Sequence, residues 1–251
     1  MVDLGIDGKK IEGVGLMIFD RDGTLIDVYT YWSQMVRYRA ELICERLGIN
    51  SKHKKELMYA MGIDEKNRRI RSEGPVGLKK REVVMQAAVD YLSNIGHQNT
   101  HDLCFRVFNE VDRISYDKLD ELVKPLDGLY DLFTALNTSS CKIAIATTDK
   151  LDRAKLIMDH LMLSKKIDYI VGADSVKNGK PAPDMINLIV KELGIPKSKT
   201  VMVGDAITDV KMGLNSEIRA SIGVGSGLTP ERELRRITAY VIKDISKIKI
   251  T

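Results

Sequence analysis

The chain has 251 residues, 44% of them hydrophobic and 29% charged, which is the balance of a folded protein that can bury a sizeable core. Its 39 Lys and Arg residues against 35 Asp and Glu residues give a net charge of +4. This charge is too small and too scattered to indicate a nucleic-acid-binding protein, and it suits a small anionic substrate equally well. We therefore expect one large domain, or a domain with an insert, and no nucleic acid among its partners.

Cysteine usage and hydropathy predict a cytoplasmic protein. The sequence contains three cysteines and no CxxC spacing, which indicates reduced thiols rather than a disulfide framework. No stretch approaches the roughly 20 consecutive apolar residues of a membrane span, and residues 1–13 lack the apolar segment of a signal peptide. We expect no membrane partner, and the sequence is silent on oligomeric state.

The first predicted element is a buried strand over residues 14–20, VGLMIFD, an apolar block that ends in an acid and is followed by the turn-forming DGT. Beyond residue 125, apolar blocks alternate with amphipathic stretches, which predicts a βαβα order and a parallel sheet. The expected strands cover 142–149, 168–172, 199–205, 220–225 and 239–242, and the expected helices cover 128–137, 150–162, 184–194 and 209–214.

Residues 28–124 have a different texture, dominated by amphipathic helical patterns such as those of 31–48 and 81–96. They predict a helical domain inserted into a sheet domain made of residues 1–27 and 125–251. Glycines and charges over 62–82 interrupt the insert and predict an ordered loop. Its basic cluster is interpreted as solvated surface, with recognition of an acidic substrate as the alternative, and consists of Arg68, Arg69, Arg71, Lys79, Lys80 and Arg81.

The segment DRDGT places two carboxylates one residue apart on a tight turn after the first strand. This pattern suits phosphoryl transfer, in which Asp20 attacks phosphorus to form an acyl phosphate. Asp22 can then protonate the leaving alkoxide and later deprotonate the attacking water. Gly23 lets the backbone approach the phosphate closely, and we assign phosphate binding to Gly23 and Thr24.

The later strands supply the donors and the metal ligands that such a site needs. Thr147 ends an expected strand, where its hydroxyl and the following amides can hold a phosphate oxygen, and Thr148 competes for that role. Lys180, in the proline-stiffened loop GKPAPD, can hold an ammonium over the phosphate and the Asp20 carboxylate. Asp205 and Asp209, in GDAITD, are carboxylates suited to octahedral Mg²⁺.

These segments, in this order, resemble the four signature motifs of the haloacid dehalogenase superfamily, in its phosphatase branch with a helical cap between the first two motifs. The resemblance spans the chain after residue 13. It implies an α/β fold with a Rossmann-like parallel-sheet core and an inserted α-helical cap domain. It also implies that Asp20 is the nucleophile, that Asp22 is the acid and base, and that Thr147 and Lys180 bind the phosphate.

The resemblance further implies Mg²⁺ as the cofactor, bound by Asp20, the carbonyl of Asp22 and Asp205, with Asp209 supporting the metal through water. The expected function is hydrolysis of a phosphate monoester of a small metabolite, of the phosphoglycolate or sugar phosphate type. Dehalogenase-like members lack an acid two residues after the nucleophile, so Asp22 favours phosphate esters. Two alternatives stay open, a phosphomutase related to β-phosphoglucomutase and a catalytically silent binding module.

Overall fold

The computed structural model describes residues 1–77 and 79–250, which fold into two compact units. One unit comprises Met1–Asp27 and Pro125–Thr251, and the other comprises Val28–Lys124. Leu78, part of the loop predicted over 62–82, lies outside the described residues.

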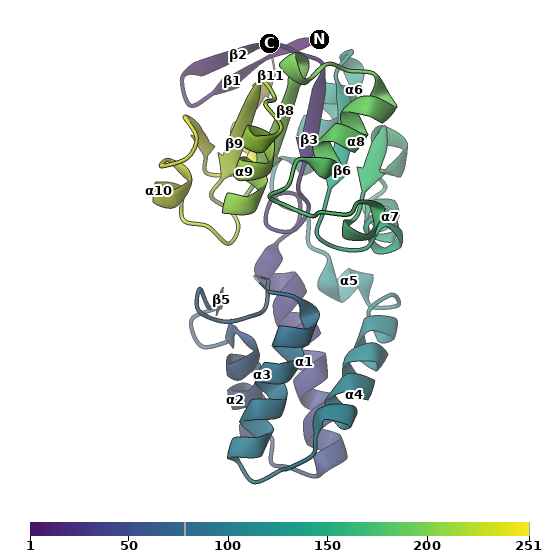
Figure 1. The fold of residues 1–251 in the computed structure, drawn as a ribbon, viewed down its shortest axis with the longest axis vertical. Helices are drawn as coiled ribbons and strands as arrows, with labels where there is room; N and C mark the ends of the chain where they lie inside the picture. Colours follow the sequence, from purple (N-terminus) through teal and green to yellow (C-terminus); the bar gives the residue numbers. More distant parts are fainter. Residues whose placement is uncertain (78, 251) are drawn as a thin grey trace. The chain divides into compact units, whose positions relative to one another are not determined.

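The first unit is built on a parallel sheet. Its strands are β3 (Leu16–Phe19), β6 (Lys142–Ala146), β7 (Tyr169–Val171), β8 (Thr200–Gly204), β9 (Ala220–Val224) and β10 (Tyr240–Ile242). Within the described residues they form a six-stranded sheet in the order β10-β9-β8-β3-β6-β7 (Figure 1). The central strands β3 and β8 are buried along their whole length, as in a sheet covered on both faces. The predicted α/β class with a parallel sheet is confirmed.

Helices cover both faces of this sheet. They are α6 (Leu129–Thr138), α7 (Leu151–His160), α8 (Asp184–Leu193), α9 (Ile207–Asn215) and α10 (Glu231–Leu234), with short 3₁₀ turns at Ser164–Lys166, Ala173–Ser175, Lys197–Lys199 and Ile245–Lys247. Ile18 of β3 packs in a cluster with Ile186 of α8, whereas the ring of the next residue, Phe19, lies 5.3 Å from that of Phe133 in α6. Because successive strand residues point to opposite faces, α8 and α6 lie on opposite sides of the sheet.

The register of the central strands brings their carboxyl ends together. Phe19 at the end of β3 pairs with Ile145 of β6 on one side and with Val203 of β8 on the other. Since the three strands run parallel, the residues that follow them collect at one edge of the sheet. Asp20 and Asp205 are therefore neighbours in space although many residues separate them in sequence.

A small antiparallel sheet that the sequence patterns did not predict completes this unit. It consists of β1 (Val2–Ile6), β2 (Lys9–Val14) and β11 (Lys249–Ile250), in the order β11-β1-β2. Asp7 and Gly8 connect β1 to β2 with φ values of 48° and 75°, the positive values that a two-residue hairpin turn requires. Figure 1 shows this sheet beside the two termini.

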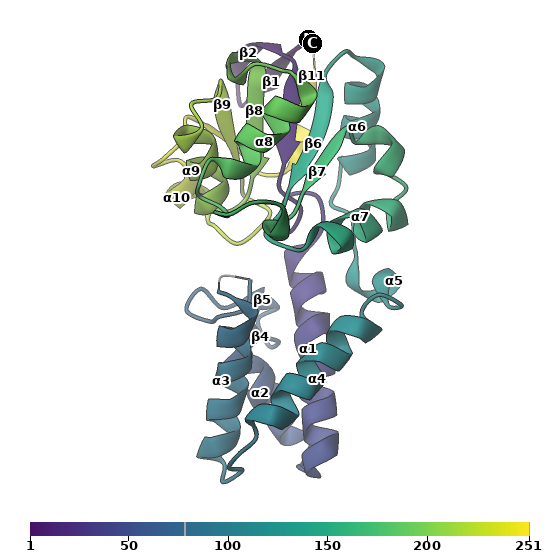
Figure 2. The same ribbon diagram turned by 45° about the vertical axis from the view of Figure 1, so that its right-hand side comes forward.

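The second unit is mainly helical. Its elements are α1 (Val28–Leu47), α2 (Lys52–Met61), β4 (Ile63–Asp64), β5 (Arg69–Ile70), α3 (Arg81–Asn94), α4 (His101–Ile114) and α5 (Leu119–Leu122). Helix α1 packs against α2 and α4, and helix α3 also packs against α2 and α4 (Figure 2). The segment predicted as a loop over 62–82 contains the two-stranded β4-β5 hairpin.

The three cysteines, Cys44, Cys104 and Cys141, are buried and unpaired, as their spacing indicated. Burial raises the pKa of the Cys104 and Cys141 thiols to about 11, so they stay protonated at neutral pH. None of the helices in the described part of the chain combines the length and apolarity needed to cross a membrane.

Candidate active site

Buried carboxylates and a buried lysine form a polar cluster at the carboxyl edge of the parallel sheet. Asp20 follows β3, Asp205 follows β8 and Asp209 lies in the first turn of α9. They are 6%, 1% and 1% exposed, and each contributes an oxygen within 4.8 Å of the others. Lys180, from the loop before α8, donates to Oδ1 of Asp20 at 2.6 Å and pairs with Oδ1 of Asp209 at 2.6 Å. The fold thus brings these four predicted residues together.

Among the described residues of this cluster, negative charge exceeds positive charge, because three carboxylates lie around the single ammonium group of Lys180. Burial raises the pKa of Asp20; Lys180 opposes this effect and the charge of Asp209 adds to it. Burial also raises the pKa of Asp205 well above its usual 3.8, reinforced by the charges of Asp20 and Asp209. Burial by itself would lower the pKa of Lys180, but attraction by Asp20 and Asp209 outweighs it and raises that pKa. A further cation would relieve the excess.

The oxygen atoms of the cluster fit a hard divalent cation. Both oxygens of Asp209 are already engaged. Oδ1 pairs with Lys180, and Oδ2 accepts a hydrogen bond from the amide of Ala206 at 2.9 Å. Asp20 uses Oδ1 for Lys180, and Asp205 uses Oδ2 for the amide of Leu228 at 2.7 Å. Oδ1 of Asp205 accepts only a long hydrogen bond, from Thr24 at 3.5 Å. This oxygen and the second oxygen of Asp20 are therefore the ligands best suited to a cation, because Mg²⁺ prefers carboxylate oxygen.

Glycines make room for the Asp205 side chain. A Cβ atom built on Gly227 would lie 2.0 Å from Oδ2 of Asp205, and one built on Gly23 would lie 2.6 Å from the same oxygen. The amide of Gly23 is used inside its own turn, where it donates to the carbonyl of Ile26 at 2.8 Å. The loop of Gly227 and Leu228 was missed from the sequence, although its GSG segment directly after β9 is a recognisable turn signal.

The carboxylate of Asp22 does not join this cluster but pairs with its own neighbour. Arg21 donates to Asp22 from Nε at 2.7 Å and from Nη2 at 2.8 Å, and Nη2 also donates to Asp149 at 3.0 Å. The Arg21 side chain is fully buried, and that of Asp22 is 15% exposed. Sequence patterns did not indicate Arg21 or Asp149. A charged residue between two aspartates, as Arg21 is, is typical of a solvated turn.

The threonines occupy different environments. Thr147, directly after β6, is 1% exposed, and its Oγ1 accepts a hydrogen bond from the amide of Asp149 at 3.2 Å, so its hydroxyl proton is available for donation. Thr148 is exposed. Thr24 is fully buried, with its Oγ1 3.5 Å from Oδ1 of Asp205. A phosphate role for each of these residues stays a prediction.

The basic segment of the second unit is partly neutralised by nearby acids. Arg69 pairs with Asp64 at 3.1 Å, and Arg71 pairs with Glu73 at 3.1 Å. Lys80 is exposed. These pairings favour the solvated-surface interpretation of the cluster over anion binding.

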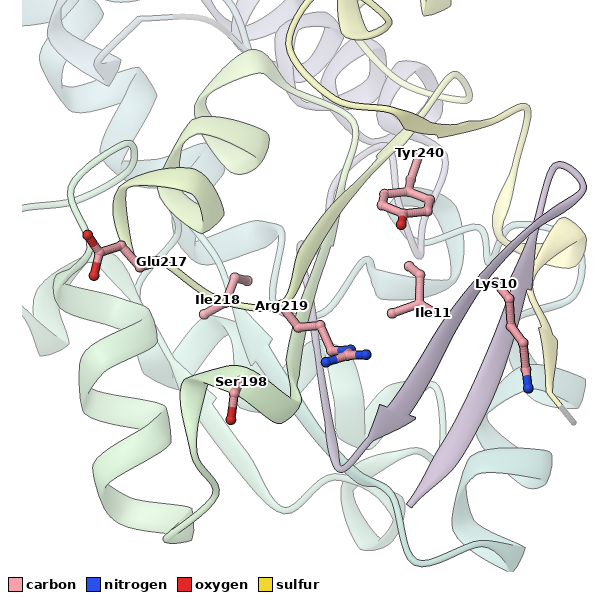
Figure 3. Close-up of a pocket in the computed structure, with 7 residues that line it drawn as sticks. All are labelled: Lys10, Ile11, Ser198, Glu217, Ile218, Arg219 and Tyr240. Carbon is pink, nitrogen blue, oxygen red and sulfur yellow. The ribbon is translucent and has the colours of Figure 1, made fainter.

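A hollow of about 300 Å³ lies at the opposite edge of the parallel sheet (Figure 3). It is lined by Ser198 before β8, Arg219 before β9 and Tyr240 at the start of β10, together with Lys10 and residues around them. Ser198, Arg219 and Tyr240 lie at the amino ends of parallel strands. The hollow is therefore separate from the buried carboxylates, which follow the carboxyl ends.

The sequence profile of the haloacid dehalogenase-like hydrolases matches residues 14–216. The match includes the strands that carry Asp20, Thr147 and Asp205 and the loop that carries Lys180. The chain therefore belongs to this family of hydrolases, and the resemblance drawn from its motifs is confirmed.

Curated relatives are named as phosphatases. Pyrophosphatase PpaX of Halalkalibacterium halodurans is 32% identical over 127 residues, which cover 50% of this chain and 59% of that protein. The chain spans about half the length of the pyrophosphatases that it matches. A phosphorylated carbohydrates phosphatase of Thermotoga maritima is 26% identical over 228 residues, which cover 90% of this chain and 92% of that protein.

Solved structures share the fold at low sequence identity. One is described as a predicted phosphoglycolate phosphatase from Haemophilus somnus, with a TM-score of 0.71, 16% identity and coverage of 94% of this chain and 96% of that one. Another, a hydrolase of subfamily IA from Geobacter sulfurreducens, has a TM-score of 0.67, 15% identity and 94% coverage of both chains. At these identities the likeness concerns the fold alone.

Proposed function

We propose that this hydrolase is a Mg²⁺-dependent phosphatase that removes the phosphoryl group of a small phosphorylated metabolite through a phosphorylated Asp20. The observation that carries the proposal is the buried cluster of Asp20, Lys180, Asp205 and Asp209 at the carboxyl edge of the sheet. A nucleophilic carboxylate, a fixed ammonium and spare carboxylate oxygens are the groups that phosphoryl transfer requires.

In the first step, a carboxylate oxygen of Asp20 attacks phosphorus, and the bond from phosphorus to the leaving oxygen breaks as the acyl phosphate forms. Lys180 holds Asp20 in place through the 2.6 Å hydrogen bond and offsets charge on the phosphoryl oxygens. The carboxyl of Asp22 gives its proton to the leaving oxygen. In the second step, Asp22 takes a proton from water, which attacks phosphorus and releases phosphate and Asp20.

The metal assignment uses carboxylate oxygens other than those that contact Lys180, Ala206 or Leu228. Asp20, Asp205 and the carbonyl of Asp22 would hold Mg²⁺, and Asp209 would orient Lys180 and the ligands around it. When bound, the ion offsets negative charge on the phosphoryl group and on the carboxylates. Thr147 would donate its hydroxyl proton to a phosphoryl oxygen, since its oxygen already accepts from Asp149.

The test is a phosphate-release assay with the purified chain. The panel contains phosphoglycolate, hexose phosphates, inorganic pyrophosphate and p-nitrophenyl phosphate, each with Mg²⁺ and with EDTA. The names of the relatives motivate the pyrophosphate and the carbohydrate phosphates. We expect phosphate release that requires Mg²⁺, and recovery of a phosphorylated Asp20 peptide after rapid quenching.

Asp20→Asn is the matched control, because it keeps the shape of the side chain and removes the nucleophile. It should lower turnover by roughly a thousandfold or more while the circular dichroism spectrum stays unchanged. Near-normal turnover by this variant, or full activity in EDTA, would contradict the mechanism. Formation of a hexose phosphate isomer without phosphate release would indicate the mutase alternative, and binding without turnover would indicate a silent binding module.

A further inference from the structure

Arg21 is a buried cation that the phosphoryl-transfer scheme does not yet use. It lies between the nucleophile Asp20 and the acid-base residue Asp22 in the chain, and its side chain is 0% exposed. Burying a guanidinium is costly unless its donors are paired with good geometry. An apolar side chain could fill the same space without that cost, so the contacts of Arg21 need a functional reason.

The first contact is a two-point hydrogen bond to the adjacent residue. Nε and Nη2 of Arg21 donate to the two oxygens of Asp22, at 2.7 and 2.8 Å. A planar guanidinium that meets both oxygens of a carboxylate restricts its rotation as well as its position. A lysine could neutralise Asp22 but could not restrict its rotation in this way.

The second contact connects Arg21 to the neighbouring strand. Nη2 also donates to Oδ2 of Asp149 at 3.0 Å, and the amide of Asp149 donates to Oγ1 of Thr147 at 3.2 Å. Arg153 of α7 pairs with the same oxygen of Asp149 at 3.5 Å. A chain of hydrogen bonds therefore runs from the carboxylate after β3 to the hydroxyl after β6.

From this chain of contacts we infer that Arg21 is a positioning residue, which orients the Asp22 carboxyl group and holds it in register with Thr147 through Asp149. The inference rests on the proposed function. Proton transfer requires the acid to lie within hydrogen-bond reach of the leaving oxygen while the phosphoryl group is held elsewhere. Through its contacts, Arg21 keeps the Asp22 carboxyl group at a fixed distance from the hydroxyl of Thr147.

The test compares Arg21→Met with Arg21→Lys in single-turnover reactions. The substrates are a primary alkyl phosphate, whose leaving group needs a proton, and p-nitrophenyl phosphate, whose leaving group does not. Arg21→Met should slow alcohol release by about 10- to 100-fold and change p-nitrophenol release by less than about threefold. Arg21→Lys, which keeps the charge without the two-point contact, should show the same selectivity.

A double variant separates positioning from general support of the fold. If Arg21 acts through Asp22, Arg21→Met should slow alcohol release very little further in an Asp22→Asn background. Multiplicative losses in the double variant, equal losses on both substrates, or full activity of Arg21→Lys would overturn the inference. Should Arg21→Met fail to fold, as judged by circular dichroism, Arg21→Lys and its double variant decide the question.

Arg39→Met is the control for loss of a buried arginine. Arg39 is 3% exposed and donates to Asp112 at 3.0 Å in the second unit. Arg39→Met should lower the melting temperature without changing the ratio of the single-turnover rates of alcohol release and p-nitrophenol release. Wild-type turnover of both substrates would support the proposed function whatever the Arg21 variants show, so the two proposals fail separately.

Discussion

The Asp205 side chain shows how closely the backbone limits a single residue of this site. Its oxygens accept from Leu228 and lie beside Thr24, and the glycines Gly23 and Gly227 leave it just enough space. If a carboxylate confined in this way shifts, it loses the hydrogen bond that it accepts from the amide of Leu228. The position of an oxygen proposed to bind the metal therefore depends on residues that contribute no side chain.

Gly227→Ala tests this dependence. The added Cβ would lie 2.0 Å from Oδ2 and 2.3 Å from Cγ of Asp205, so the carboxylate must move. We expect the Mg²⁺ concentration for half-maximal activity to rise by about 10- to 100-fold. Gly15→Ala is the control, since its Cβ would meet its neighbours at 3.5 Å or more. Equal Mg²⁺ requirements for the two variants would contradict the prediction.

At the scale of elements, the β11-β1-β2 sheet joins the two ends of the chain within one unit. Leu4 and Ile6 on β1 are fully buried, whereas Asp7 and Gly8 form the exposed turn. Leu4 pairs with Ile11 of β2 and with Ile250 of β11. The apolar face of this sheet therefore contributes to the core as the helices of the parallel sheet do.

Leu4→Ala measures that contribution. Removing a fully buried leucine side chain costs about 2–5 kcal/mol, and each kcal/mol lowers the melting temperature of a chain of this size by roughly 2–4 °C. Met162→Ala is the matched control, because Met162 is 87% exposed, and its melting temperature should stay close to wild type. A loss for Leu4→Ala no larger than that of the control would show that the sheet adds nothing to stability.

For the whole molecule, the buried carboxylates make stability depend on pH and on metal together. The pKa values of Asp20 and Asp205 are raised by burial above their usual 3.8, so ionising them costs stability in the metal-free protein. This cost is absent below about pH 4 and grows as the pH rises through the raised pKa values. The raised pKa of Lys180 has the opposite effect, because it contributes stability. This contribution is fully present below pH 10.5, the usual pKa of lysine, and is lost only at higher pH.

Asp205→Asn tests the sign of this effect through melting curves. In EDTA at pH 7 the variant lacks one buried charge, so it should melt higher than wild type by about 2–4 °C, the shift that 1 kcal/mol produces. The difference should shrink towards pH 4, where the wild-type carboxyl is protonated. Added Mg²⁺ should raise the melting temperature of wild type at pH 7 and not that of Asp205→Asn. A wild type that melts higher than the variant in EDTA would contradict the assignment.

The sequence by itself determined the sheet, the order of its strands along the chain and the residues at their carboxyl ends. These features follow from local patterns, because a fully buried parallel strand is a continuous apolar run and ends where the polar residues begin. Asp20 and Asp205 are predicted in this way, and Lys180 and Asp209 are predicted from the segments GKPAPD and GDAITD that follow later strands. The Asp-Gly turn of the β1-β2 hairpin is also a local signal. The sheet was nevertheless not predicted, because its strands are short and β1 pairs with β11 at the far end of the chain.

Only the tertiary structure decided what each polar side chain contacts. Whether Asp22 faces the other carboxylates or Arg21, and which side chain lies beside Gly23, depends on strands brought together across long stretches of sequence. The amide of Leu228 and the carboxylate of Asp149 entered the site for the same reason. Local patterns report burial and strand ends, whereas hydrogen-bond partners and pKa shifts are set by distances between residues remote in sequence.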